Sequence, residues 1–99
     1  MIAVFVKASV ASDHLDDFKA SAQQLLAQTQ AQDSGLVSYD FATLIEEGTQ
    51  GEFAFFERWH SGRDLAAHRA SAHFQQALAS WEPYLLEPLE VRVYDLLAS

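Results

Sequence analysis

Four stretches of the chain alternate apolar and polar or smaller side chains with the period of a β-strand. They cover residues 2–8, 36–45, 52–59 and the segment from Leu89 to Leu97. Two longer stretches, from Leu15 to Thr29 and from Leu65 to Leu78, repeat apolar residues with helical spacing instead. The pattern therefore predicts the order strand, helix, strand, strand, helix, strand.

Local signals predict where the helices begin and end. Ser12 or Asp13 can cap the first helix, and Gly35 is a natural stop for it. Ser61 and Asp64 have the spacing of a capping box that opens the second helix. The inner side of that helix is expected to carry Leu65, His68, Ala72 and His73, and the sequence leaves open whether Ser71 breaks it. Residues 46–51 read as a hairpin loop, and residues 81–88 can hold one more turn.

This order is that of the ferredoxin-like βαββαβ fold, an α+β class with an antiparallel four-stranded sheet and helices on one face. We expect a single domain over residues 1–99. Two helices cover only one face of such a sheet, yet apolar residues occur on both sides of the strands: Phe5, Phe56 and Leu96 lie opposite the others. In the second strand we place Val37, Tyr39 and Phe41 on one face, and Leu36, Ala42 and Leu44 on the other. Because a large apolar face is rarely left bare, we expect a homodimer packed sheet to sheet.

Charge and composition exclude several classes of function. The formal net charge of −8 disfavours binding to nucleic acids and to membrane surfaces. The absence of cysteine excludes disulfides, thiolate zinc sites and cysteine nucleophiles. No apolar run approaches the ~18 residues of a membrane span. A cytoplasmic location is the expectation.

Signatures of metals and common cofactors are weak. His68 and His73 are five residues apart, which separates them by ~140° on a straight helix and disfavours joint metal ligation. No G-x-S-x-G elbow, phosphate loop or dinucleotide fingerprint occurs. We therefore expect neither a metal nor a cofactor.

The third strand and the second helix carry the groups that can do chemistry. Glu57 and Trp59 share a strand face with Phe53 and Phe55, and His68 follows on the inward side of the helix. The helix should fold over that face and enclose a mostly apolar cavity, suited to a small aromatic ligand. A histidine there can take or give a proton near neutral pH.

Plainer interpretations of these residues stay open. Trp59 can be a core residue only, and His68 or His73 can be a hydrogen-bonded structural histidine. Glu57 can simply pair with Arg69 or Arg92, and whether Tyr39 faces the cavity depends on strand register.

Several fixed positions resemble the antibiotic biosynthesis monooxygenase domain family. They are Glu57-x-Trp59-x-Ser61, Leu65-x-x-His68-x-x-Ser71-x-His73-Phe74, and the upstream segment from Gly35 to Tyr39. The resemblance spans essentially the whole chain. It implies a dimeric α+β barrel with a pocket in each subunit, and a cofactor-independent monooxygenase acting with O2 on quinols or aromatic polyketides.

Two other branches of that family fit less well. The haem-degrading branch implies a histidine where Leu78 stands and an asparagine on the first strand, which has none. A branch acting on a phosphorylated sugar implies a cationic pocket, for which only Lys7 and Arg58 are candidates. A non-oxidative enzyme such as an isomerase, and a non-catalytic small-molecule-binding dimer, remain alternatives.

For the oxygenase, we predict His68 as the base and His73 as the second choice. Trp59, Phe55 and Phe74 are predicted to contact the aromatic substrate, and Tyr39 or Glu57 to orient it by hydrogen bonding.

Overall fold

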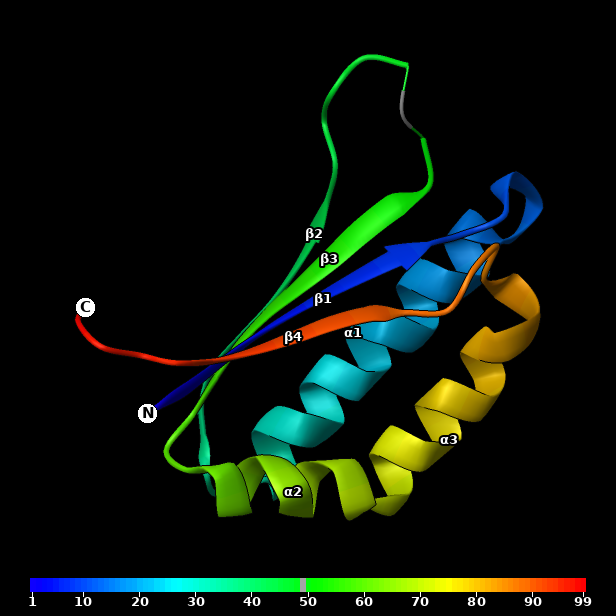
Figure 1. The fold of residues 1–99 in the computed structure, drawn as a ribbon. Helices are drawn as coiled ribbons and strands as arrows, with labels where there is room; N and C mark the ends of the chain where they lie inside the picture. The colour runs from blue at the N-terminus through cyan, green and yellow to red at the C-terminus, as the bar shows by residue number, and fades with distance from the viewer. Residues whose placement is uncertain (49) are drawn as a thin grey trace.

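The computed structural model describes residues 1–48 and 50–99, and it has the predicted α+β ferredoxin-like architecture. The four strands are antiparallel neighbours in the order β2-β3-β1-β4. Figure 1 shows the helices layered against one face of the sheet, with α1 and α3 side by side and the other face bare. The elements are β1 (Ile2–Ser9), the 3-10 turn η1 (Ser12–His14), α1 (Leu15–Gln32), β2 (Leu36–Thr43), β3 (Glu52–Trp59), α2 (Gly62–Ala70), α3 (Ala72–Trp81), the 3-10 turn η2 (Glu82–Tyr84) and β4 (Glu90–Asp95).

The core lies between the sheet and the α1–α3 pair. Phe18 of α1 is fully buried, and its ring contacts Phe53 and Phe55 of β3 and Trp81 of α3. The indole Nε1–H of Trp81 donates to Ser21 Oγ at 2.9 Å, so the large ring is buried without an unpaired donor. Alternate residues of β3 from Phe53 to Trp59 face this core, as the two-residue period predicted.

The predicted ends of the first helix are wrong. The chain turns through η1 and enters α1 at Leu15, and neither Ser12 nor Asp13 makes a side-chain cap bond there. The helix ends at Gln32, three residues before Gly35. Gly35 serves a different need: a Cβ at this position would lie 2.2 Å from Asp64 Cγ, so only glycine lets the start of α2 approach this closely.

A β-bulge corrects the predicted faces of β2. The register shifts between Leu36 and Ser38, so that Leu36 pairs with Trp59 and packs on the core instead of the opposite face. Val37, expected beside Tyr39, is 41% exposed. A bulge leaves the two-residue pattern intact on either side of it, so the alternation alone does not reveal it.

The break at Ser71, which the sequence left open, is present. The Ser71 hydroxyl accepts from the Phe74 backbone N–H and donates to the His68 carbonyl at 2.6 Å, which ends α2 and begins α3 at one residue. Ser61 likewise caps α2 by accepting from the Asp64 N–H, as predicted. His68 and His73 are both buried, whereas Ala72, expected on the inner side, is exposed.

The bare face of the sheet mixes apolar and charged groups. Phe5 and Phe56 pack against each other there with ring centroids 5.6 Å apart, and Phe56 is 48% exposed. The Lys7–Glu52 ion pair crosses the same face. Leu96, expected in the last strand, lies beyond the end of β4. The homodimer remains a prediction.

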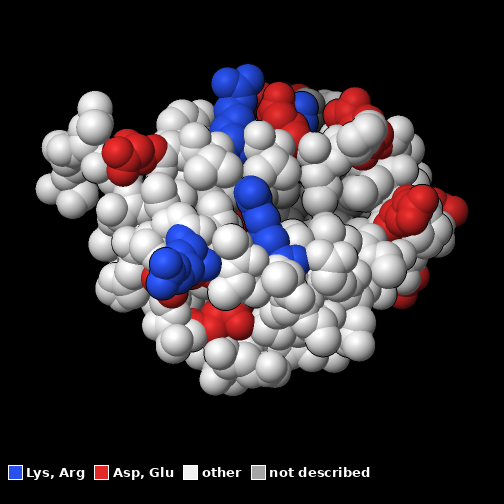
Figure 2. Space-filling model, turned by 60° about the horizontal axis from the view of Figure 1, so that its bottom comes forward, with Lys and Arg blue, Asp and Glu red and all other residues white. Residues whose placement is uncertain are grey.

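Charge is spread thinly on the surface that Figure 2 presents. Acidic and basic side chains are scattered there, and no basic patch gathers in this view of the described residues. Within the part of the chain that the structure describes, no helix has the length and apolar character to cross a membrane.

Candidate active site

A cavity of about 330 Å³ lies between the sheet and the helices α2 and α3. Its walls are mostly aliphatic and aromatic, and four polar side chains reach it: Tyr39, Glu57, His68 and Arg69. Apolar walls with a few polar groups are typical of sites for small aromatic ligands. The apolar lining residues are Val4, Val6, Phe55, Leu65, Phe74, Leu78, Trp81, Leu89 and Val91.

Five of the seven predicted site residues line this cavity. They are Tyr39, Phe55, Glu57, His68 and Phe74. Trp59 and His73 do not line the cavity, but both contact His68. The ring centroid of Trp59 lies 4.6 Å from that of His68, and the ring centroid of His73 lies 5.9 Å from it. Trp59 therefore supports the site and does not form its wall.

His68 is held by a carboxylate that the sequence did not reveal. Its Nδ1 lies 2.6 Å from Asp33 Oδ2, while its Nε2 is buried and has no hydrogen-bond partner among the described residues. Asp33 is the C-cap residue directly after α1, and there it lies beside His68 of α2, which is 35 positions further along the chain. Nothing in the local sequence distinguishes Asp33 from the other acids near helix ends, so only the tertiary packing identifies it.

This pairing fixes the chemistry of the imidazole. Burial lowers the pKa of His68, and the hydrogen bond and charge of Asp33 oppose part of that shift. A neutral ring that donates Nδ1–H to Asp33 leaves a lone pair on Nε2. This is the arrangement of a general base oriented by a carboxylate.

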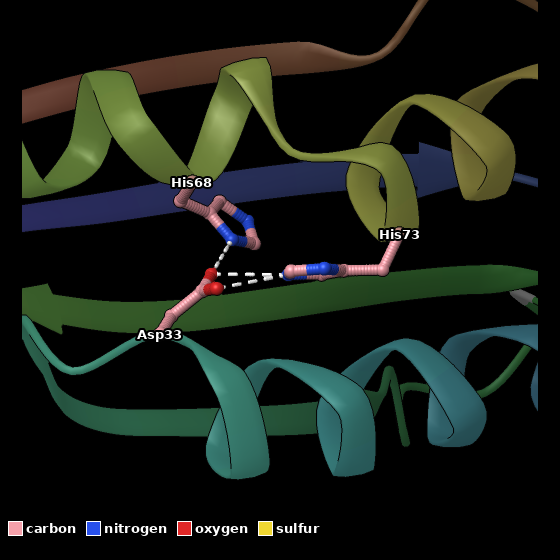
Figure 3. Close-up of side chains that lie close together, drawn as sticks. All are labelled: Asp33, His68 and His73. Atoms are coloured by element: carbon pink, nitrogen blue, oxygen red, sulfur yellow. Dashed lines mark hydrogen bonds and ion pairs between the residues drawn. The ribbon is translucent and has the colours of Figure 1, made fainter.

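Asp33 is shared with the second predicted histidine. His73 Nε2 lies 3.0 Å from Asp33 Oδ1 and 3.2 Å from Oδ2 (Figure 3). The two imidazoles approach the carboxylate from different helices, His68 from the end of α2 and His73 from the start of α3. The break at Ser71 makes this possible, because it turns the chain between them.

The same three residues are a geometric candidate for a metal. Their ligand atoms lie within 4.8 Å of one another, so the straight-helix premise for separating His68 and His73 is wrong. However, His68 Nδ1 and His73 Nε2 are each within hydrogen-bond distance of the Asp33 carboxylate. The other ring nitrogen of His68, Nε2, takes no part in these contacts. We therefore interpret the cluster as a hydrogen-bonded network.

Glu57 is the buried acid of the cavity. Its Oε1 accepts from Trp59 Nε1–H at 2.9 Å. Burial raises the pKa of Glu57, and the Trp59 hydrogen bond and the charge of Arg69 offset part of the rise. Burial thus shifts the titration of Glu57 toward its neutral form, whose O–H can donate a hydrogen bond. Of the two arginines predicted as its partner, Arg69 acts on Glu57 through its charge, which lowers the pKa of Glu57.

Tyr39 completes the polar part of the lining. Its ring meets the His68 ring edge to face at 6.0 Å. Burial, with smaller effects from the negative charges of Glu57 and Asp33, raises the pKa of Tyr39 far above its usual range. The hydroxyl therefore stays protonated and can orient a ligand by hydrogen bonding.

Fold and site together define a small α+β domain with an aromatic-lined cavity and a carboxylate-oriented histidine. The chain belongs to the antibiotic biosynthesis monooxygenase family, whose model matches residues 1–80. The resemblance that the sequence motifs indicated is thereby confirmed.

Relatives of known sequence or structure agree in length and fold. A Bacillus subtilis (strain 168) protein described as "Putative monooxygenase YcnE" is 28% identical over 91 residues, covering 92% of this chain and 93% of the relative. The structure of Rv0793 from Mycobacterium tuberculosis is 28% identical, with a TM-score of 0.88 over 99% of this chain and 96% of that one. A further similar structure is that of a "putative antibiotic biosynthesis monooxygenase" from Caulobacter crescentus CB15. Its TM-score is 0.90 at 20% identity, and the match covers 98% of this chain and 90% of that one. The last likeness shows the fold alone.

Proposed function

We propose that the protein is a monooxygenase that oxidises a quinol or related phenolic substrate with dioxygen, without a cofactor. One observation carries the proposal: His68 lines an apolar cavity, its Nδ1 is bound to Asp33, and its Nε2 has no hydrogen-bond partner in residues 1–48 and 50–99. A phenolic hydroxyl is a fitting partner for that nitrogen. Membership of the family supports the general class of reaction.

The chemistry begins with proton transfer. His68 Nε2 takes the phenolic proton, and Asp33 stabilises the imidazolium that forms. The resulting phenolate is electron-rich and can itself reduce dioxygen, so the substrate supplies all four electrons. For a naphthoquinol, C10H8O2 and O2 give the hydroxynaphthoquinone C10H6O3 and H2O. One oxygen atom enters the ring, and the other leaves as water after taking up protons.

The remaining groups hold the anion and exclude water. Phe55, Phe74 and Leu65 form walls in which an anionic oxygen meets few solvent molecules, which strengthens its interactions with nearby donors. Tyr39 and Glu57 line the same cavity, and burial raises the pKa of both, which supports a role for their O–H groups as donors to the substrate oxygens. Trp59 acts indirectly, through its hydrogen bond to Glu57.

The proposal includes a cytoplasmic homodimer. The bare sheet face, with Phe5 and Phe56 at its centre, is the surface on which a second copy would pack. A second hollow of about 320 Å³ on this face, lined by Phe5, Phe56, Arg58 and Tyr94 among others, is suited to receive side chains of the partner copy.

Oxygen uptake tests the function. Chemically reduced naphthoquinol is mixed with the protein, and uptake is compared with the spontaneous rate. We expect acceleration by the unmodified protein, loss of it in His68→Gln, and retention in His60→Gln, a control at an exposed histidine. Binding of the quinol without acceleration would support the alternative of a non-catalytic binding protein.

A further inference from the structure

His73 faces a hollow different from the cavity. This hollow has a volume of about 130 Å³ and lies between α1 and α3. We call it the α1–α3 groove, and it is lined by Ser21, Gln24, Gln28, His73, Gln76, Ala77 and Ser80. His68 lines the cavity, His73 lines the groove, and Asp33 lies between the two rings (Figure 3). The cluster thus connects the cavity with a polar groove.

The cluster has one negative charge for two imidazoles. His68 and His73 bind the same carboxylate, and their ring centroids are only 5.9 Å apart. Both rings are buried, so two imidazolium ions would repel each other strongly, and Asp33 can neutralise only one. Accordingly, a positive charge on His73 lowers the pKa of His68.

Three other ionisable groups surround the cluster. Arg69 on α2 adds positive potential at His68, and burial raises the pKa of Glu57 on β3 and of Tyr39 on β2. Asp33 can balance a positive charge on one histidine or on the other, because it contacts both rings. His73 Nε2 contacts both of its carboxylate oxygens, within 3.2 Å.

We propose that His73 is the proton outlet of the site: when His68 takes a proton from a phenol in the cavity, His73 loses one to the α1–α3 groove. This inference rests on the proposed function. Before the step, the phenol is neutral and the cluster carries one proton, on His73. After it, the phenol is a phenolate, the cluster carries one proton on His68, and one proton has entered the solution. When His68 later returns its proton to the forming water, His73 recovers one from the groove.

The position of the outlet has a physical advantage. His68 lines the cavity but is only 1% exposed, and its Nε2 is buried. A proton leaving through the cavity would have to pass the ligand. Release from His73 occurs on the other side of Asp33, so the phenolate stays shielded from water while the charge of the cluster remains balanced.

Calorimetry of a phenol that cannot form a quinone directly tests this exchange. 2-Naphthol is titrated into the protein in two buffers of different ionisation enthalpy, which reports the protons released on binding. We expect one proton per bound phenol for the unmodified protein and for His60→Gln. For His73→Gln, whose amide N–H can still donate to Asp33, we expect binding with no proton released. Equal release with and without His73, or none from the unmodified protein, would overturn the proposal.

A ligand-free measurement separates this inference from the proposed function. Nitrogen-15 spectra of the histidine rings are followed against pH in the unmodified protein, His73→Gln and His73→Asn. Removing the competing charge should move the titration of His68 to higher pH in either variant. An unchanged titration in folded variants would refute the coupling even if oxygen uptake is normal. A shifted titration without oxygen uptake would retain the coupling and reject the oxygenase.

Discussion

Replacing Asp33 by asparagine removes the charge that orients the proposed base while preserving the shape of the side chain. Asp33 accepts hydrogen bonds from His68 at 2.6 Å and from His73 at 3.0 Å, and its side chain is 11% exposed. Hydrogen bonds to charged groups contribute about 1.5–3 kcal/mol each, and the amide oxygen can retain one of the two. We therefore expect Asp33→Asn to lower the free energy of unfolding by about 2 kcal/mol.

The effect on the reaction should be larger. Both influences of Asp33 raise the pKa of His68, so their loss lowers that pKa further and weakens the base. If the amide NH2 faces His68, the ring must also take the tautomer that protonates Nε2, which cannot accept the substrate proton. Together these changes predict a fall in turnover of about 10²–10⁴-fold, the usual range for general-base catalysis.

The assay is oxygen uptake with naphthoquinol, combined with 2-naphthol affinity and a urea denaturation curve. Asp16→Asn, the same change at an exposed site of α1, is the matched control and should behave like the unmodified protein. A folded Asp33→Asn variant that binds 2-naphthol and turns over within about threefold of the unmodified rate would refute the base assignment.

Three further substitutions test other parts of the account. Trp59→Phe removes the buried donor to Glu57 and leaves a smaller ring, so the free energy of unfolding should fall by about 2–3 kcal/mol in urea; an unchanged midpoint would contradict the packing described. Burial raises the pKa of Glu57 above 4.5, so the folded protein keeps a proton that the unfolded chain loses, and the free energy of unfolding should decline as pH rises above 4.5. Glu57→Gln should flatten that decline; parallel plots of the free energy of unfolding against pH for the two proteins would refute it. Phe56→Glu on the bare sheet face should give monomers in sedimentation, whereas Gln24→Glu on α1 should not; a dimer in both would place the interface elsewhere.

The sequence predicted the fold well where a local pattern, such as strand alternation or a capping residue, was enough to define the element. The alternation from Phe53 to Trp59 identified β3 with its correct faces, and Ser61 marked the start of α2 because a capping residue acts on its immediate neighbours. It failed at Leu36, where a bulge reverses the side that the residue faces. Gly35 was read as a helix stop although its small size matters for the approach of Asp64, a contact that only tertiary packing creates.

The site was predicted only in part for the same reason. Glu57 and His68 could be found because an acid and a histidine on inward-facing positions stand out against apolar neighbours. Asp33 could not, since its partners are 35 and 40 residues away and its own surroundings in the sequence are ordinary. The prediction that helical geometry keeps His68 and His73 apart was also wrong, because Ser71 interrupts the helix between them.

Anaerobic mixing of the protein with naphthoquinol isolates deprotonation of the substrate by His68 from the later reaction with oxygen. We predict that the red-shifted absorption of the bound quinolate appears with the unmodified protein near neutral pH and is absent with His68→Gln. Quinol that binds and stays neutral in the unmodified protein, or that ionises equally well in His68→Gln, would contradict it.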